Sequence, residues 1–136
     1  MKTLLAPDIQ NKVKDVVLKL RLDYIKPENV VCMRSFGAQT RAIARIWSLP
    51  KIWQQALHFE PHYIIEVVSE KYDKQSDAEK DRTVIHELMH IPKGFGGGLV
   101  PHLCFGKKIN HASVEKLYEA YVKADKEQST FDAYEI

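Results

Sequence analysis

Five consecutive residues, His86-Glu87-Leu88-Met89-His90, combine two imidazoles and a carboxylate at a spacing suited to chemistry. Residues four apart in an α-helix lie one above the other on the same face, so His86 and His90 can bind one metal ion together. Glu87 is rotated by about 100° from His86, which places its carboxylate beside the metal rather than on it. The pattern predicts a metal site with an acid next to it.

This HExxH spacing indicates zinc chemistry. A zinc ion held by imidazoles lowers the pKa of a bound water towards neutrality, and a neighbouring carboxylate can take the proton from that water. We therefore expect a zinc-dependent hydrolase, and first of all a metallopeptidase that cleaves peptide bonds. In this hypothesis His86 and His90 bind Zn²⁺ and Glu87 is the catalytic general base.

A catalytic zinc usually has three protein ligands and one open position, so a third ligand is needed. His102 is the preferred candidate, because it follows His90 by twelve residues across a glycine-rich segment that can turn back towards the end of the helix. Four of the six glycines of the chain lie in this segment: Gly94, Gly96, Gly97 and Gly98.

Other residues remain candidates for the third ligand. His111, Glu115 and Glu119 recur at four-residue spacing on the last predicted helix, and Cys104 offers a thiolate. An additional group that stabilises the oxyanion is expected from His111, Tyr118 or Tyr121, and the sequence does not choose among the three.

The stretch from His86 to His102, HELMHIPKGFGGGLVPH, resembles a family of metallopeptidases from archaea and phages, whose pattern is HELxHIP, a glycine-containing loop and Pro-His. The segments ARIWSLPKIWQQAL and YIIEVVSEKYD also resemble that family, so the likeness covers about Arg41 to Tyr121. The resemblance implies that His86, His90 and His102 are the ligands and Glu87 the general base.

More loosely, the chain is similar to SprT-like and related minimal zincins, which implies a zincin-like fold. It departs from the metzincins, because the third histidine comes too late for HExxHxxGxxH and no Met-turn is recognisable. Two other functions stay open. One is a small three-histidine, metal-dependent endoribonuclease, although its histidines would be more tightly spaced. The other is a non-catalytic binding module stabilised by zinc, whose site would be closed by four ligands.

Hydrophobic periodicity and turn residues predict the elements that position these side chains. Apolar positions between Ile9 and Leu20 form one helical stripe with Asp8 as its N-cap, and Tyr63, Ile65 and Val67 alternate on one face of a strand. Before the motif we expect a helix from Asp8 to about Leu20, strands over 29–36, about 40–48 and 62–69, and a segment over 51–57 that is ambiguous between helix and strand.

The motif itself lies in a helix that Ser76 and Glu79 open as a capping box and that ends near His90, before Pro92. Asn110 begins a last helix, and residues 126–136 are expected to form a frayed tail. The sequence thus predicts one α+β domain over 1–136: a small, mainly antiparallel mixed sheet packed against the HExxH helix, with N- and C-terminal helices.

Composition limits the possible partners and location. The 136 residues carry a net charge of only +2, which makes a nucleic-acid partner unlikely on charge alone and leaves a peptide or protein as the expected substrate. No apolar run is long enough to cross a membrane, and no signal peptide is recognisable. Cys32 and Cys104 are expected to be free thiols in a reducing compartment, so we expect a cytoplasmic protein.

Overall fold

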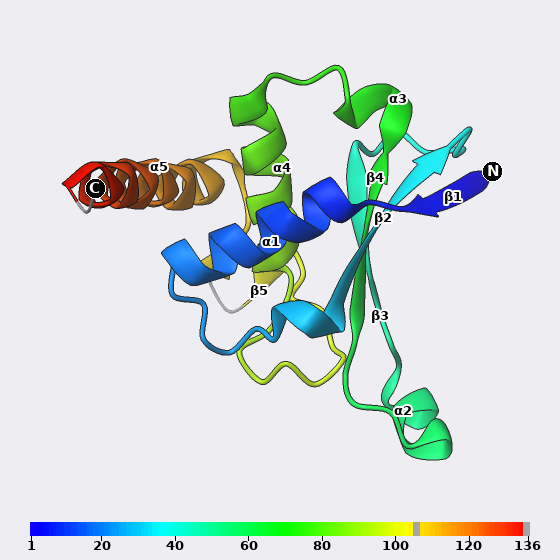
Figure 1. Cartoon of the computed structure of the whole chain (residues 1–136). Helices are drawn as coiled ribbons and strands as arrows, with labels where there is room; N and C mark the ends of the chain where they lie inside the picture. The colour runs from blue at the N-terminus through cyan, green and yellow to red at the C-terminus, as the bar shows by residue number, and fades with distance from the viewer. Residues whose placement is uncertain (105–106, 135–136) are drawn as a thin grey trace.

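The computed structural model describes residues 1–104 and 107–134. Figure 1 shows the long helices on one side of the sheet and the short helices near opposite ends of the strands. The elements in chain order are β1 (Lys2–Leu5), α1 (Pro7–Lys19), a 3₁₀ turn (Pro27–Asn29), β2 (Val30–Phe36), β3 (Ala44–Ser48), α2 (Lys51–Leu57), β4 (Tyr63–Val68), α3 (Ser69–Tyr72), α4 (Asp77–Met89), β5 (Leu103–Cys104), β6 (Lys107–Lys108) and α5 (His111–Tyr134).

The sheet is small and mixed, with the strand order β1-β2-β4-β3. β2 and β4 are parallel, whereas β1 pairs with β2 and β3 pairs with β4 in antiparallel fashion. The predicted α+β class with a mainly antiparallel mixed sheet is therefore confirmed. β3 begins at Ala44, later than expected, and forms one edge of the sheet. The ambiguous segment over 51–57 is the helix α2.

The core lies between the helices and one face of the sheet. Tyr63, Ile65 and Val67 of β4 are buried on this face, as their alternation predicted. The helices contribute their apolar stripes to the same core. Its helical members are Ile9, Val13, Val16 and Val17 of α1, Tyr72 of α3, Val84, Ile85 and Leu88 of α4, and Val114 and Tyr121 of α5.

The predicted start of the first helix was wrong. Ala6 is the N-cap and Pro7 opens α1, because proline has no backbone N–H to leave unpaired and its fixed φ suits the first helical position. Asp8 is already inside the first turn, where its carboxylate pairs with Arg34 of β2 at 2.7 Å. The strand β1, which the sequence did not predict, precedes this turn directly; its four residues are all exposed and show no alternation of burial.

The helix that carries the motif begins as predicted. The hydroxyl of Ser76 accepts a hydrogen bond from the backbone N–H of Glu79 at 3.2 Å, and the Glu79 carboxylate accepts one from the Ser76 backbone N–H at 3.2 Å. This capping box opens α4, and His90 is its C-cap. His86 and Glu87 thus lie in the last turn of a helix whose start is fixed by two reciprocal hydrogen bonds.

The last helix is longer than expected. Asn110 opens it by accepting a hydrogen bond from the Ser113 backbone N–H at 3.0 Å, as the sequence predicted. The frayed tail expected after Asp125 is instead helical as far as Tyr134, because no glycine or proline follows to end the helix. No helix among the described residues is long and apolar enough to span a membrane.

Candidate metal centre

α4 presents His86 and His90 one turn apart on the same face, with their ring centroids 5.2 Å apart. This is the geometry that the four-residue spacing predicted. His90 is only 9% exposed and Glu87 only 7% exposed. The end of α4 therefore brings a buried imidazole and a buried carboxyl group next to the partly buried imidazole of His86.

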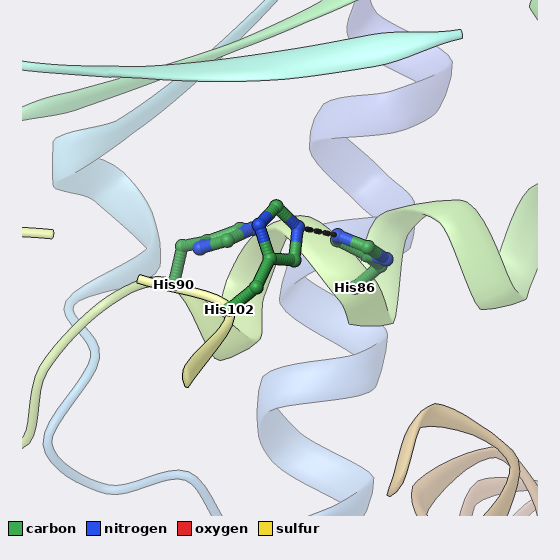
Figure 2. Close-up of side chains that lie close together, drawn as sticks. All are labelled: His86, His90 and His102. Atoms are coloured by element: carbon green, nitrogen blue, oxygen red, sulfur yellow. Dashed lines mark hydrogen bonds between the residues drawn. The ribbon is translucent and has the colours of Figure 1, made fainter. Parts of the chain in front are cut away.

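His102 joins the other two histidines from the segment that follows α4. Its ring centroid lies 5.3 Å from that of His86 and 4.7 Å from that of His90. One nitrogen of each of the three rings can be chosen so that all three atoms lie within 4.8 Å of one another. Figure 2 shows the rings converging, His86 and His90 from the helix and His102 from the chain that passes beside it.

The spacing and donor set of this cluster suit a zinc ion. Two nitrogen ligands at about 2.0–2.1 Å from a tetrahedral zinc lie about 3.3–3.4 Å apart. The Nε2 atoms of His86 and His102 are 3.2 Å apart, close to that value. Among the described residues the cluster consists of three histidines, and three is the usual number of protein ligands of a catalytic zinc.

A hydrogen bond to the backbone of Val100 determines which ring nitrogen of His90 is engaged. Nδ1 of His90 lies 2.6 Å from the carbonyl oxygen of Val100, which can only accept a hydrogen bond. Nδ1 therefore donates a hydrogen bond to Val100, and Nε2 is the ring nitrogen that remains to face a metal. The backbone N–H of Val100 in turn donates to the His90 carbonyl at 2.7 Å.

Burial also shifts the pKa values of His86 and Glu87. The pKa of His86 is lowered by burial and by its proximity to His90 and His102, which favours the neutral imidazole that a metal requires. Burial raises the pKa of Glu87 to about 7. A carboxyl group with a pKa near neutrality can both accept and return a proton, which general acid–base catalysis needs.

A cavity of about 1100 Å³ adjoins the cluster. It is lined by all three histidines and Glu87, by the chain from Arg41 to Ile46, and by the first turns of α5. The edge strand β3 therefore borders the same space as the histidines, and Figure 2 shows a strand passing above the rings. The cavity gives a substrate access to the cluster from the edge of the sheet.

The other candidates for the third ligand are placed differently. The Glu115 carboxylate is paired with Arg82 of α4 at 2.7 Å, and Glu119 is exposed beside a separate hollow on α5. His111 lines the cavity without belonging to the three-histidine cluster. The side chain of Cys104 lies outside the described residues, whereas Cys32 is a buried free cysteine.

The structure also separates the three residues considered for oxyanion stabilisation. Tyr118 packs against Arg82, whose guanidinium carbon lies 4.2 Å from the centre of the tyrosine ring. The hydroxyl of Tyr121 is hydrogen-bonded to Asp15 of α1 and is 3.3 Å from the Lys12 ammonium group. Of the three, only His111 lines the cavity.

Sequence reasoning missed the residues that hold the glycine-rich segment in place. The hydroxyl of Tyr63 accepts a hydrogen bond from the Gly97 N–H at 2.9 Å and donates one to the Gly98 carbonyl at 2.9 Å. The Gln54 side-chain amide donates to the Gly96 carbonyl at 3.1 Å. The burial of Tyr63 was readable from the strand pattern, but no local signal pairs its hydroxyl with residues 34 and 35 positions away.

Comparison with known protein families identifies a family that matches most of the chain. No curated protein and no solved structure matches the chain. The model of one family, described as putative phage metallopeptidase, matches residues 1–124 and so spans both the sheet and the histidine cluster. The match agrees with the resemblance seen in the stretch from His86 to His102. The chain belongs to this putative phage metallopeptidase family.

Proposed function

We propose that the protein is a zinc-dependent peptidase in which His86, His90 and His102 bind the metal and Glu87 is the general base. One observation carries the proposal: three imidazole nitrogens within 4.8 Å of one another lie beside a buried carboxyl group in a cavity bordered by a sheet edge. Membership of a metallopeptidase family supports a metal cofactor and a peptide or protein substrate. The arrangement of helix, loop histidine and edge strand also supports a minimal zincin-like fold.

The metal would supply Lewis acidity, polarising the scissile carbonyl group and lowering the pKa of a water molecule. Glu87 accepts a proton as the water oxygen attacks the carbonyl carbon, and it passes that proton to the amine nitrogen when the C–N bond breaks. Burial of Glu87 next to the cluster keeps bulk water away from this carboxyl group. His111, which lines the cavity, would donate a hydrogen bond to the oxyanion.

The edge strand β3 supplies a way to hold an extended peptide. β3 pairs with β4 on one side only, so that the backbone groups of its other edge can hydrogen-bond to an added strand. The residues of this chain that line the cavity from β3 include Ala44 and Ile46, of which Ala44 leaves room for a substrate side chain. An extended peptide would thereby be held at β3 through main-chain hydrogen bonds.

The test compares the wild type with Glu87→Gln, after zinc has been counted in both proteins. We expect both to contain one zinc per chain and only the wild type to hydrolyse casein, because the amide cannot accept the proton. Glu119→Gln makes the same chemical change at an exposed position of α5 and should retain activity. Full hydrolysis by Glu87→Gln, or cleavage of single-stranded RNA in place of casein by the wild type, contradicts the proposal.

A further inference from the structure

The segment between α4 and His102 is held by a side chain from the opposite side of the core. Tyr63, the first residue of β4, reaches the segment with its hydroxyl, which accepts from the Gly97 N–H and donates to the Gly98 carbonyl, both at 2.9 Å. One hydroxyl thus satisfies a donor and an acceptor on two consecutive residues. Their positions relative to the sheet are fixed by this contact.

Tyr63 is itself fully buried. The residue is 1% exposed, and its ring packs against that of Phe95 with the centroids 5.1 Å apart. Phe95 is a residue of the same segment and is 8% exposed. The ring of Tyr63 therefore packs against the apolar side chain of Phe95, and its hydroxyl binds the backbone of Gly97 and Gly98. A buried side chain of the sheet thus holds the glycine-rich segment in place.

A second contact holds the segment from α2. The Gln54 side-chain amide donates to the Gly96 carbonyl at 3.1 Å and to the Leu49 carbonyl at 2.8 Å. Gly97 approaches this region so closely that a Cβ atom added to it would lie 2.7 Å from the Leu49 carbonyl oxygen. The segment therefore lies directly on the chain that joins β3 to α2.

His102 follows these contacts by only a few residues. Val100 comes two residues after Gly98, and it exchanges two hydrogen bonds with His90, one through its N–H at 2.7 Å and one through its carbonyl at 2.6 Å. His102 follows two residues later. The segment is thus fixed at residues 96–98 and again at Val100 before it presents the histidine.

We propose that Tyr63 is a positioning residue for the metal centre: its hydroxyl orders the glycine-rich segment so that His102 stands beside His86 and His90 before a metal arrives. The inference rests on the proposed function, because it assumes that His102 is a ligand. A glycine-rich chain loses more conformational entropy on ordering than any other, and contacts that order it in advance remove that cost from metal binding.

The experiment measures zinc affinity by competition with a chromophoric chelator in Tyr63→Phe and in the matched control Tyr72→Phe. Both substitutions remove only a hydroxyl from a buried tyrosine, but Tyr72 lies in α3, beyond the other end of β4. We expect Tyr63→Phe to weaken zinc binding by about tenfold, which is the lower end of the range for groups that orient a metal ligand. Tyr72→Phe should leave the zinc affinity unchanged. Gln54→Met removes the hydrogen bond from α2 to Gly96 and should also weaken zinc binding, although no residue of α2 belongs to the core.

A double-mutant cycle with His102→Ala separates positioning from general stability. If Tyr63 acts through His102, then Tyr63→Phe should cause no further loss of zinc affinity once His102 has been removed. In the cobalt-substituted protein, Tyr63→Phe should shift the visible absorption towards that of His102→Ala, whereas Tyr72→Phe should match the wild type.

The possible results are distinct. An equal loss in the His102→Ala background, an equal loss in Tyr72→Phe, or unchanged affinity in Tyr63→Phe overturns the role of Tyr63 while the metal centre stands. A wild-type protein that binds no zinc overturns the proposed function and the inference together.

Discussion

Nδ1 of His90 donates a hydrogen bond to the carbonyl oxygen of Val100, and the two atoms are 2.6 Å apart. The contact joins the end of α4 to the segment that carries His102, because Val100 precedes His102 by two residues. It also engages Nδ1 of His90 as a donor, which leaves Nε2 as the ring nitrogen available to a metal. A single hydrogen bond thus connects the chemistry of one histidine to the placement of another.

Removal of His90 should therefore abolish stoichiometric zinc binding. His90→Ala deletes one proposed ligand and the side-chain bond to Val100, so that the purified variant should contain far less than one zinc per chain by elemental analysis. His62→Ala is the matched control, since the His62 ring contacts the Glu60 carbonyl at 2.7 Å and lies outside the cluster. A His90→Ala protein that retains one tightly bound zinc would remove His90 from the ligand set.

The sequence predicted the parts of the centre that depend on local spacing. His86 and His90 meet because four residues make about one helical turn, and the capping box of Ser76 and Glu79 is a short pattern within one segment. The return of His102 was predicted from its glycine-rich approach, and the structure does bring the three rings together.

Long-range contacts could not be read in the same way. The pairing of the exposed strand β1 with β2 and the bonds of Tyr63 to Gly97 and Gly98 join residues about 30 positions apart, and neither leaves a pattern in its own segment. Asp8 was assigned as a cap because its residue type favours one, but Pro7 fixes the helix start one residue earlier. Here the preference of proline for the first helical position outweighed the preference of aspartate for the cap.

His111 should affect turnover more than metal content. It lines the cavity but is not part of the cluster, so His111→Ala should retain one zinc per chain. Loss of a hydrogen-bond donor to the oxyanion should lower kcat by about 10²-fold or more, with a smaller effect on KM. His58→Ala, at an exposed position beside α2, provides the control. If kcat for His111→Ala stays within a few fold of the wild type, another group stabilises the oxyanion.

Stability should fall in acid through the contacts of Arg34. The Arg34 guanidinium donates to Asp8 at 2.7 Å and to Asp73 at 2.9 Å, and these hydrogen bonds hold the pKa of both carboxyl groups below the ordinary value of 3.8. A carboxyl group whose pKa is lower in the folded state stabilises the fold above its unfolded pKa. That contribution is lost as the pH falls through the folded value.

Arg34→Met should therefore reduce the free energy of unfolding at pH 6 and flatten its decline below about pH 4. Chemical denaturation at a series of pH values measures both effects. Arg41→Met removes the same charge from an exposed position and should leave the decline intact. An unchanged pH dependence in Arg34→Met would show that these two carboxyl groups do not control acid unfolding.

Gly97 should be the least replaceable glycine of the segment. Its φ is +105°, a backbone conformation that residues with a side chain rarely adopt, and a Cβ atom there would lie 2.7 Å from the Leu49 carbonyl oxygen. Gly97→Ala should reduce the free energy of unfolding by about 1–3 kcal/mol, because the backbone must leave this conformation or shift away from Leu49.

The matched control is Gly94→Ala, where an added Cβ would have no neighbour within 4 Å. Its effect on the free energy of unfolding should be within about 0.5 kcal/mol, the range for surface substitutions. Because Gly97 precedes His102 by five residues, Gly97→Ala should also weaken zinc binding, whereas Gly94→Ala should not. Equal stability and equal zinc affinity in the two variants would mean that the close approach of Gly97 to Leu49 does not constrain the segment.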